Sequence, residues 1–181
     1  MGIFNFSQKK KATPNIKDMI WMSQSAKLTG CFKLLQEQKE FVVVAWFSKT
    51  QEEFHQFLNE QHGLGVEIQL AQTAISTQIS DKKLILLEHF PLRGKEETFI
   101  INLNPSQVIV LSSLDEPLFE IFGSDEIIRM MKSLGMKEDE MIEHPMISKS
   151  IVRAQQKLEQ KVICENFADS SKEWFQRNGS I

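Results

Sequence analysis

The chain has 181 residues and a mass of 20.9 kDa, a length that corresponds to about one domain. Hydrophobic residues make up 41% of the chain and charged residues 25%, which is the balance of a globular protein. The formal net charge of −3 gives no sign of the basic surface on which nucleic-acid binding depends and disfavours that function, so we expect no nucleic-acid partner. Cys31 and Cys164 are far apart, which predicts reduced thiols and a cytoplasmic location rather than a disulfide scaffold.

The N-terminal residues do not carry a targeting signal that we recognise. A short apolar stretch precedes Lys9 to Lys11, which is the reverse of the order in a secretory signal peptide. Position 6 is Phe6, where myristoylation requires Ser or Thr. We therefore expect residues 1–14 to form a mobile tail, with a short membrane-touching or partner-docking peptide as the alternative. No transmembrane segment is expected in the chain.

The middle of the chain alternates between strand and helix patterns. The apolar run Phe41–Phe47 is typical of a strand that is buried on both faces of a parallel sheet. Weaker runs predict further strands at Val66–Leu70, Leu84–Leu87, Phe99–Leu103 and Val108–Leu111. Of these, Phe99–Leu103 also fits an antiparallel edge strand. The alternation predicts an α/β fold with a mainly parallel sheet.

Two predicted helices flank the first strand. The helix before it has apolar residues on one face, at Leu28, Cys31, Phe32 and Leu35. After the strand, Thr50 and Glu53 have the spacing of a capping box, in which each side chain pairs with a free backbone N–H at the helix start. The buried stripe of this second helix is expected to contain Phe54, Phe57 and Leu58.

The last third of the chain is predicted to be helical. Ser124 is expected to cap one helix, and Gly135 to end it in a left-handed conformation. A longer helix starts at about Ser148, with a packing face at Ile151, Ala154, Leu158 and Val162. It is either a surface helix or one that docks onto a partner. We divide the chain into the tail 1–14, an α/β domain 15–122 and a helical C-terminal extension 123–181.

Motifs for catalysis and metal binding do not occur. The only Gly-Lys pair, Gly94-Lys95, has His89 where a phosphate-binding P-loop requires its first glycine. No cysteines or histidines have zinc-ligand spacing, and no nucleophile elbow of the G-x-S-x-G type is present. We therefore expect no catalytic residue, no metal and no cofactor.

Polar residues follow the predicted strands at the places where open α/β sheets bind ligands. Glu88 and His89 come at the end of one strand, and because neighbouring strand residues face opposite sides they do not form a ready-made catalytic pair. The candidate residues of a small-ligand crevice are Ser48, Lys49, Thr50, Glu88, His89, Arg93 and Asp115. Ordinary polar loop residues are the alternative interpretation.

From Leu111 onward the sequence resembles the SecA preprotein translocase ATPases. The similar segments are Leu111–Gly135, which contains Ile-Phe-Gly-Ser, Met136–His144, which ends in Ile-Glu-His, and Ser148–Glu159, which contains Ala-Gln-Gln-Lys-Leu-Glu. A weaker resemblance covers Asp18–Trp21, Ala26-Lys27 and Phe41–Phe54, which are similar to the family's entry helix and to the strand and helix that follow it. The resemblance implies one RecA-like, helicase C-terminal-like fold, the second nucleotide-binding fold of this family.

The centre of the chain departs from the SecA pattern. The Thr-Asn-Met-Ala-Gly-Arg-Gly-Thr-Asp and Gln-Leu-Arg-Gly-Arg-Ser-Gly-Arg motifs, which supply the family's phosphate-contacting arginines, do not occur, and Leu92-Arg93-Gly94 is a faint echo of the second. The P-loop and Mg-binding acids of the first fold are also missing, and the pattern is lost after Glu159. Phosphoryl transfer needs all these parts together, so we expect no ATP hydrolysis by this chain.

The resemblance therefore implies a stand-alone, degenerate and non-catalytic copy of the second fold, which serves as a protein-interaction or accessory module linked to protein translocation. Its expected partner is the full-length translocase ATPase or another copy of itself. The alternative function is a small-ligand or nucleotide-binding module that uses the crevice at the strand ends.

Overall fold

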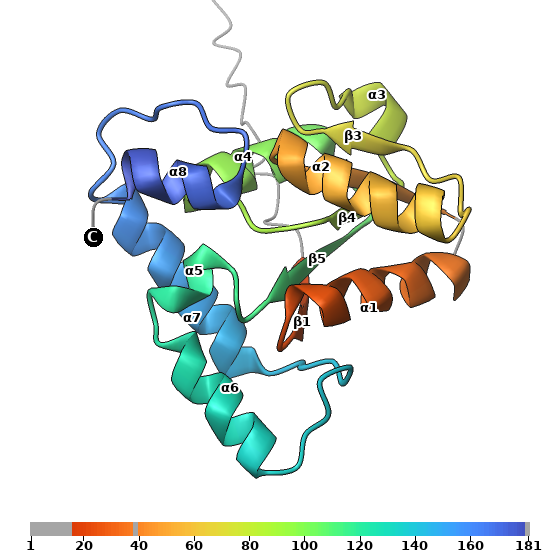
Figure 1. Cartoon of the computed structure of the whole chain (residues 1–181). Helices are drawn as coiled ribbons and strands as arrows, with labels where there is room; N and C mark the ends of the chain where they lie inside the picture. Colours follow the sequence, from red (N-terminus) through yellow and green to blue (C-terminus); the bar gives the residue numbers. More distant parts are fainter. Residues whose placement is uncertain (1–15, 38–39, 180–181) are drawn as a thin grey trace, which may run out of the picture.

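A computed structural model of the protein describes residues 16–37 and 40–179 (Figure 1). These residues form a five-stranded, all-parallel sheet with the strand order β1-β5-β4-β2-β3. The strands are β1 (Ile16–Trp21), β2 (Phe41–Ala45), β3 (Ile68–Leu70), β4 (Lys83–Leu86) and β5 (Gln107–Ser113). The predicted α/β fold with a parallel sheet is confirmed, and it is consistent with a single RecA-like domain. The predicted tail 1–14 lies outside the described residues.

Helices connect and cover the strands. The connecting helices are α1 (Gln24–Glu37), α2 (Ser48–His55) with its π-helical continuation η1 (Gln56–Gln61), α3 (Ser76–Ile79) and α4 (Arg93–Leu103). Those that follow the sheet are α5 (Pro117–Glu120), α6 (Ser124–Ser133), α7 (Pro145–Glu159) and α8 (Ser171–Asn178). Among the described helices, none combines the length and the apolar character needed to cross a bilayer.

The two faces of the sheet are covered by different helices. On one face, Cys31 of α1 and Phe54 of α2 pack against strand residues such as Val43. On the other face, Ile79 of α3 and Ile100 of α4 pack against β4 and β5. The chain therefore leaves β2 toward one face and the adjacent β4 toward the other. The point between these two strand ends is the topological switch point of the sheet, where open α/β folds bind ligands.

The C-terminal helices close the carboxyl-terminal end of the sheet. Figure 1 shows α5 to α8 gathered on one side, beyond the end of β5. One apolar cluster joins Trp46 and Phe90, which follow β2 and β4, to Ile151 and Leu158 of α7 and to Trp174 of α8. The packing stripe predicted for the long helix is confirmed at Ile151, Ala154 and Leu158, which are buried, whereas Val162 lies beyond the end of α7 and is half-buried. The division into 15–122 and 123–181 stays a prediction, since this cluster draws on both parts.

Two elements differ from the sequence predictions. Phe99–Leu103, predicted as a strand, forms the end of α4, in which Ile100 and Leu103 are buried at helical spacing. Asp18–Trp21, which resembled an entry helix, lies in β1 and pairs with β5. Both errors have one cause: a short apolar run suits a buried strand and the buried side of a helix equally.

The predicted helix caps are also wrong in detail. Helix α2 starts at Ser48 with Phe47 as its N-cap residue, and the Thr50 hydroxyl binds Glu88 instead of closing a capping box with Glu53. Helix α6 starts at Ser124 itself, after Gly123 in a left-handed conformation (φ 75°). The end at Gly135 is confirmed by its φ of 82°.

Candidate functional site

Glu88 occupies the switch point between β2 and β4. Its Oε1 atom accepts hydrogen bonds from the backbone N–H groups of Trp46 (3.2 Å) and Phe47 (3.3 Å), and its Oε2 atom accepts one from the Thr50 hydroxyl (2.7 Å). The side chain is buried, with 4% of the residue exposed. The Glu88 carboxylate therefore accepts the hydrogen bonds that an anionic ligand would need at this position.

The C-terminal segment covers the start of α2. Asp169 accepts hydrogen bonds at its carbonyl oxygen from the Lys49 N–H group (3.0 Å) and at its Oδ1 atom from the Ser48 hydroxyl (3.3 Å). Free N–H groups in the first turn of a helix need partners, and here the chain itself provides one. The backbone of Lys49 is therefore engaged inside the molecule.

His89 lies between two carboxylates on the opposite side from Glu88. Its Nδ1 atom is 3.0 Å from Oε2 of Glu96, and its Nε2 atom forms an ion pair at 3.2 Å with Oδ1 of Asp18. Glu96 also accepts a hydrogen bond from the Phe90 N–H group (2.8 Å), and Arg93 lies 3.6 Å from its other oxygen. This buried group ties β1, the end of β4 and α4 together.

A buried lysine and a partly buried glutamate pair near the ends of β1 and β5. Lys27 of α1 is 1% exposed, and its Nζ atom lies 2.5 Å from Oε1 of Glu116. The same carboxylate accepts a hydrogen bond from the Ser113 N–H group (3.0 Å). Nearby, Asp115 accepts a hydrogen bond from the Gln24 N–H group (3.0 Å) at the start of α1.

Burial and neighbouring charges shift the pKa values of this region. Burial raises the pKa of Glu88 to about 7, although Lys27 and the Thr50 hydroxyl favour the charged form. Burial alone would lower the pKa of His89, but the charge of Glu96 and the contact with Asp18 outweigh it and raise that pKa to about 10. Burial disfavours a charged Asp18, yet the contacts with His89 keep its pKa below the ordinary value.

The structure brings the predicted site residues together in part. Thr50 and Glu88 meet at the switch point, Ser48 and the backbone of Lys49 pair with Asp169, and His89 and Arg93 belong to the group around Glu96. Asp115 pairs with α1 instead, and ligand binding by these residues stays a prediction. The sequence did not indicate Asp18, Lys27, Glu96 or Glu116 as partners. Asp18 pairs with His89, and Lys27 with Glu116, across more than 70 residues, which leaves no mark in one sequence. Glu96 pairs with His89 from α4, a helix that the sequence did not reveal.

The buried residues around Glu88 and His89 have a structural role. Glu88, His89 and Glu96 are at most 4% exposed, so a substrate in solution does not reach them. Within residues 16–37 and 40–179, no group of three or more acidic, His or Cys side chains has an arrangement that could hold a metal ion. What the cluster does is fix the strand ends against α1, α2 and α4 through charge-assisted hydrogen bonds.

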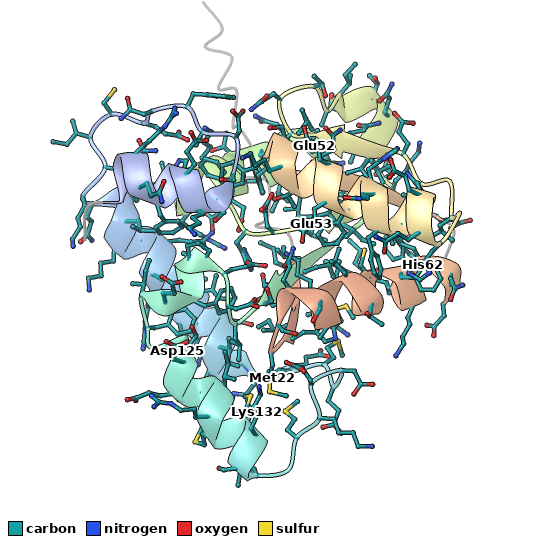
Figure 2. The ribbon with its side chains drawn as sticks, in the orientation of Figure 1. Met22, Glu52, Glu53, His62, Asp125 and Lys132 are labelled. Carbon is teal, nitrogen blue, oxygen red and sulfur yellow. The ribbon has the colours of Figure 1, made fainter. Side chains whose placement is uncertain are left out.

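The charged residues on the outside of the molecule do not gather as the buried ones do. Figure 2 labels Glu52 and Glu53 on α2, and Asp125 and Lys132 on α6. Of these, Glu53 accepts a hydrogen bond from the Gln24 side chain (2.9 Å) and so links α2 to α1. Lys132 forms a long ion pair with Glu138 (3.9 Å). These exposed charges are spread over the surface, unlike the buried cluster.

Comparison with known proteins relates part of this chain to a protein translocase. No protein-family model matches the chain. It is 57% identical over 49 residues to the protein translocase subunit SecA of Acidithiobacillus ferrooxidans, which is 27% of this chain and 5% of that protein. The SecA subunits of Prosthecochloris aestuarii and Chlorobaculum tepidum are 45% and 46% identical over 65 residues, or 36% of this chain and 6% of each relative. This chain contains a SecA-related region.

The similarity to SecA covers only part of this chain and a small part of each relative. The chain spans 5% to 6% of the length of these curated relatives, and 27% to 36% of its own residues are matched. The relation predicted from Leu111–Glu159 is confirmed to that extent. A stand-alone, degenerate copy of the second fold stays a prediction.

Proposed function

We propose that this chain is a non-catalytic accessory module of protein translocation that acts by binding another protein. Its partner is the full-length translocase ATPase or a second copy of the chain, and its place of action is the cytoplasm. The SecA-related region supports the link to translocation, and the parallel α/β fold agrees with an origin in a RecA-like domain.

The observation that carries the non-catalytic part is that the groups suited to a phosphate already pair within the chain. Arg93, in the only echo of the family's arginine motif, forms ion pairs with Glu97 (2.8 Å) and Glu96 (3.6 Å). Glu88 holds the N–H groups at the switch point. Phosphoryl transfer requires cations and N–H donors that face the phosphate. In this chain Arg93 and the N–H groups at the switch point pair with carboxylates of the protein instead.

An exposed apolar surface supports the protein-binding part. Four large apolar side chains are exposed between the end of α6 and the start of α7: Met130 (55%), Leu134 (78%), Met141 (37%) and Met146 (70%). We name these four residues the methionine surface. Flexible methionine side chains adapt to the shape of a partner, so exposed residues of this kind are candidates for a protein contact.

The apolar face of α7, which the sequence suggested as a possible docking face, is buried against other helices of the chain. Ile151 and Leu158 are 1% exposed and pack against α4 and α5 in the apolar cluster. The exposed side of α7 carries polar residues such as Lys149 and Arg153. The methionine surface is therefore the better candidate for the contact with a partner.

The test is a direct binding measurement between the purified chain and the full-length translocase ATPase of the same organism by biolayer interferometry. We expect saturable binding that the double change Leu134→Ser with Met146→Ser weakens about tenfold or more, because buried apolar anchors dominate interface energies. The matched control is Ile163→Ser, since Ile163 is fully exposed outside the methionine surface. Sedimentation of the chain alone tests the second copy as partner.

Two results would overturn the proposal. One is the absence of both ATPase binding and self-association at the highest concentrations that remain soluble. The other is steady release of phosphate from Mg-ATP by the chain alone, abolished by Arg93→Ala, which would make the chain an enzyme.

A further inference from the structure

The exposed side of α7 carries a row of three positive charges. Lys149, Arg153 and Lys157 follow one another at intervals of four residues, which places them on one side of the helix, about 6 Å apart along its axis. All three are exposed, whereas Ile151 and Leu158 on the opposite side are 1% exposed. We name the three cations the basic face, and it has no role in the proposed function.

The basic face has no negative charge to balance it. In the part of the chain that the structure describes, none of its cations forms an ion pair or a side-chain hydrogen bond. The only acidic residue of α7, Glu159, accepts a hydrogen bond from the Gly94 N–H group (2.9 Å) instead. By contrast, Arg93, Lys95 and Arg177 each lie within 2.8 Å of a carboxylate. The basic face is therefore a local excess of positive charge on a chain whose net charge is −3.

A segment of opposite charge precedes α7. Glu138, Asp139 and Glu140 are consecutive and exposed, in the loop that Figure 1 shows running from the end of α6 back to α7. Their single ion pair among the described residues, between Glu138 and Lys132, is long at 3.9 Å. We name these three carboxylates the acidic segment. It carries as many charges as the basic face, with the opposite sign.

The two charged surfaces do not meet within one copy of the chain. No ion pair joins the acidic segment to the basic face among the described residues, although the two are close in the sequence. The residues between them contact β1, because Ile142 pairs with Ile20 and Glu143 forms an ion pair with Lys17 at 3.2 Å. These contacts hold the intervening residues at the edge of the sheet. Both charged surfaces therefore stay free for contact with another molecule.

The surroundings of the basic face argue against a membrane or a nucleic acid as its partner. A helix that binds at a membrane interface inserts its apolar face, but the apolar face of α7 is buried within the chain. Nucleic-acid binding depends on a broad basic surface, which a chain of net charge −3 does not favour. An acidic protein surface fits three cations better, and every copy of this chain presents one in its acidic segment.

We infer that the basic face of one copy of the chain binds the acidic segment of a second copy. Because each copy carries both surfaces, two copies can pair reciprocally and make each contact twice, as in isologous dimers. This contact rests on the proposed function, in which a second copy is one of the two partners, and it lies outside the methionine surface. Binding of the translocase ATPase through the methionine surface stands even if the charged contact fails.

The experiment is sedimentation equilibrium of the full chain at low and high salt. We expect reversible self-association at about 50 mM salt, with a Kd of about 0.5 mM or tighter, since each exposed ion pair contributes little but the pairs act together. The Kd should rise tenfold or more at about 500 mM salt, because exposed charges are screened.

Charge reversal tests which surfaces meet. One variant reverses the basic face: Lys149→Glu, Arg153→Glu and Lys157→Glu combined. The other reverses the acidic segment: Glu138→Lys, Asp139→Lys and Glu140→Lys combined. Each variant alone should lose self-association at about 50 mM salt, because like charges would then face each other. A mixture of the two should form a heterodimer, and one chain with all six changes should self-associate again, since opposite charges meet in both cases.

The matched control reverses three exposed cations elsewhere and changes the net charge by the same amount: Lys33→Glu, Lys82→Glu and Lys172→Glu combined. It should self-associate as the natural chain does, and circular dichroism verifies the fold of each variant. The charged contact is wrong if the natural chain stays monomeric at its highest soluble concentration, if reversal of either surface leaves the Kd unchanged, or if neither the mixture nor the six-change variant associates. Equal loss in the control would also overturn it. None of these results affects a measured affinity for the ATPase, so the two proposals fail separately.

Discussion

At the scale of single residues, the most consequential side chain is His89. It is held between Asp18 and Glu96; His89 and Glu96 are buried, and 9% of the Asp18 side chain is exposed. Taking charges out of water is costly, so such a group is stable only when its members compensate one another. The pair Glu88-His89 was predictable as a feature at a strand end because it follows a buried apolar run. Its partners were not, since Asp18 sits inside an apolar strand and Glu96 in a helix that the sequence did not reveal.

Removing the imidazole should destabilise the fold strongly. His89→Gln leaves Asp18 without its paired cation and Glu96 with only Arg93, 3.6 Å away, and we expect the free energy of unfolding to fall by about 3–5 kcal/mol. Urea unfolding followed by tryptophan fluorescence measures this change. His55→Gln is the control, since His55 is more than half exposed and its ion pair with Glu60 is long at 3.9 Å. A loss for His89→Gln as small as that of the control would show that His89 does not neutralise the cluster.

The same residue predicts how stability depends on pH. The pKa of His89 is about 10 in the folded protein and 6.5 in its ordinary state, so the folded chain holds more protons between these values. Its contribution is fully present below about pH 6.5 and is lost as the pH rises toward 10. We expect the urea midpoint to fall from pH 6.5 to 9.5 in the natural protein, and the His89→Gln variant to show a flatter profile. Parallel profiles would contradict this assignment.

The ionisation of Glu88 is expected to cause a second change of stability, at lower pH. Burial raises its pKa from 4.5 to about 7, so the folded state retains this proton over that range and the Glu88 contribution falls as the pH rises through it. Glu88→Gln keeps the side chain's shape and cannot ionise, so it should remove this part of the pH dependence. Glu88→Ala leaves the N–H groups of Trp46 and Phe47 unpaired and should cost about 1–3 kcal/mol at pH 5. Equal stability of the two variants at pH 5 would show that the hydrogen bonds at the switch point contribute little.

At the scale of elements, the helix and strand patterns predicted most of the sheet but not all of its connections. Helix α1 and the buried residues Phe54 and Leu58 agree with the predicted stripes because each stripe is long enough to show a helical period. Helix α4 was missed because its apolar residues are concentrated in its last turns and its first turns carry the polar residues Arg93 to Glu97. Helix α8 was missed for a related reason: Trp174 alone of its residues is buried.

Helix α8 should nevertheless contribute substantially to stability. Trp174 is 1% exposed and packs within the cluster that joins β2, β4 and α7. We expect Trp174→Ala to lower the free energy of unfolding by about 3–5 kcal/mol, from lost burial and the cavity that remains. The control is Phe167→Ala, because Phe167 is 64% exposed, and its change should stay within about 0.5 kcal/mol. Chemical denaturation compares the two, and a cost for Trp174→Ala below 1 kcal/mol would show that α8 is not part of the core.

At the scale of the whole molecule, the fold is an α/β sheet whose ligand-binding edge is closed by its own residues. Glu88 fills the switch point, and the segment before α8 covers the start of α2. The sequence predicted the fold class and the SecA relation because both depend on patterns along the chain. It could not predict the methionine surface, since that depends on which side chains remain uncovered after packing.

The most direct test of a protein-binding role is hydrogen exchange of the chain with and without the full-length translocase ATPase of its own organism. We expect amide exchange to slow across residues 130–146, which include the methionine surface, and the protection to be lost when Leu134→Ser and Met146→Ser are combined. Protection elsewhere only, or none at saturating ATPase, would contradict the claim that this surface binds the translocase.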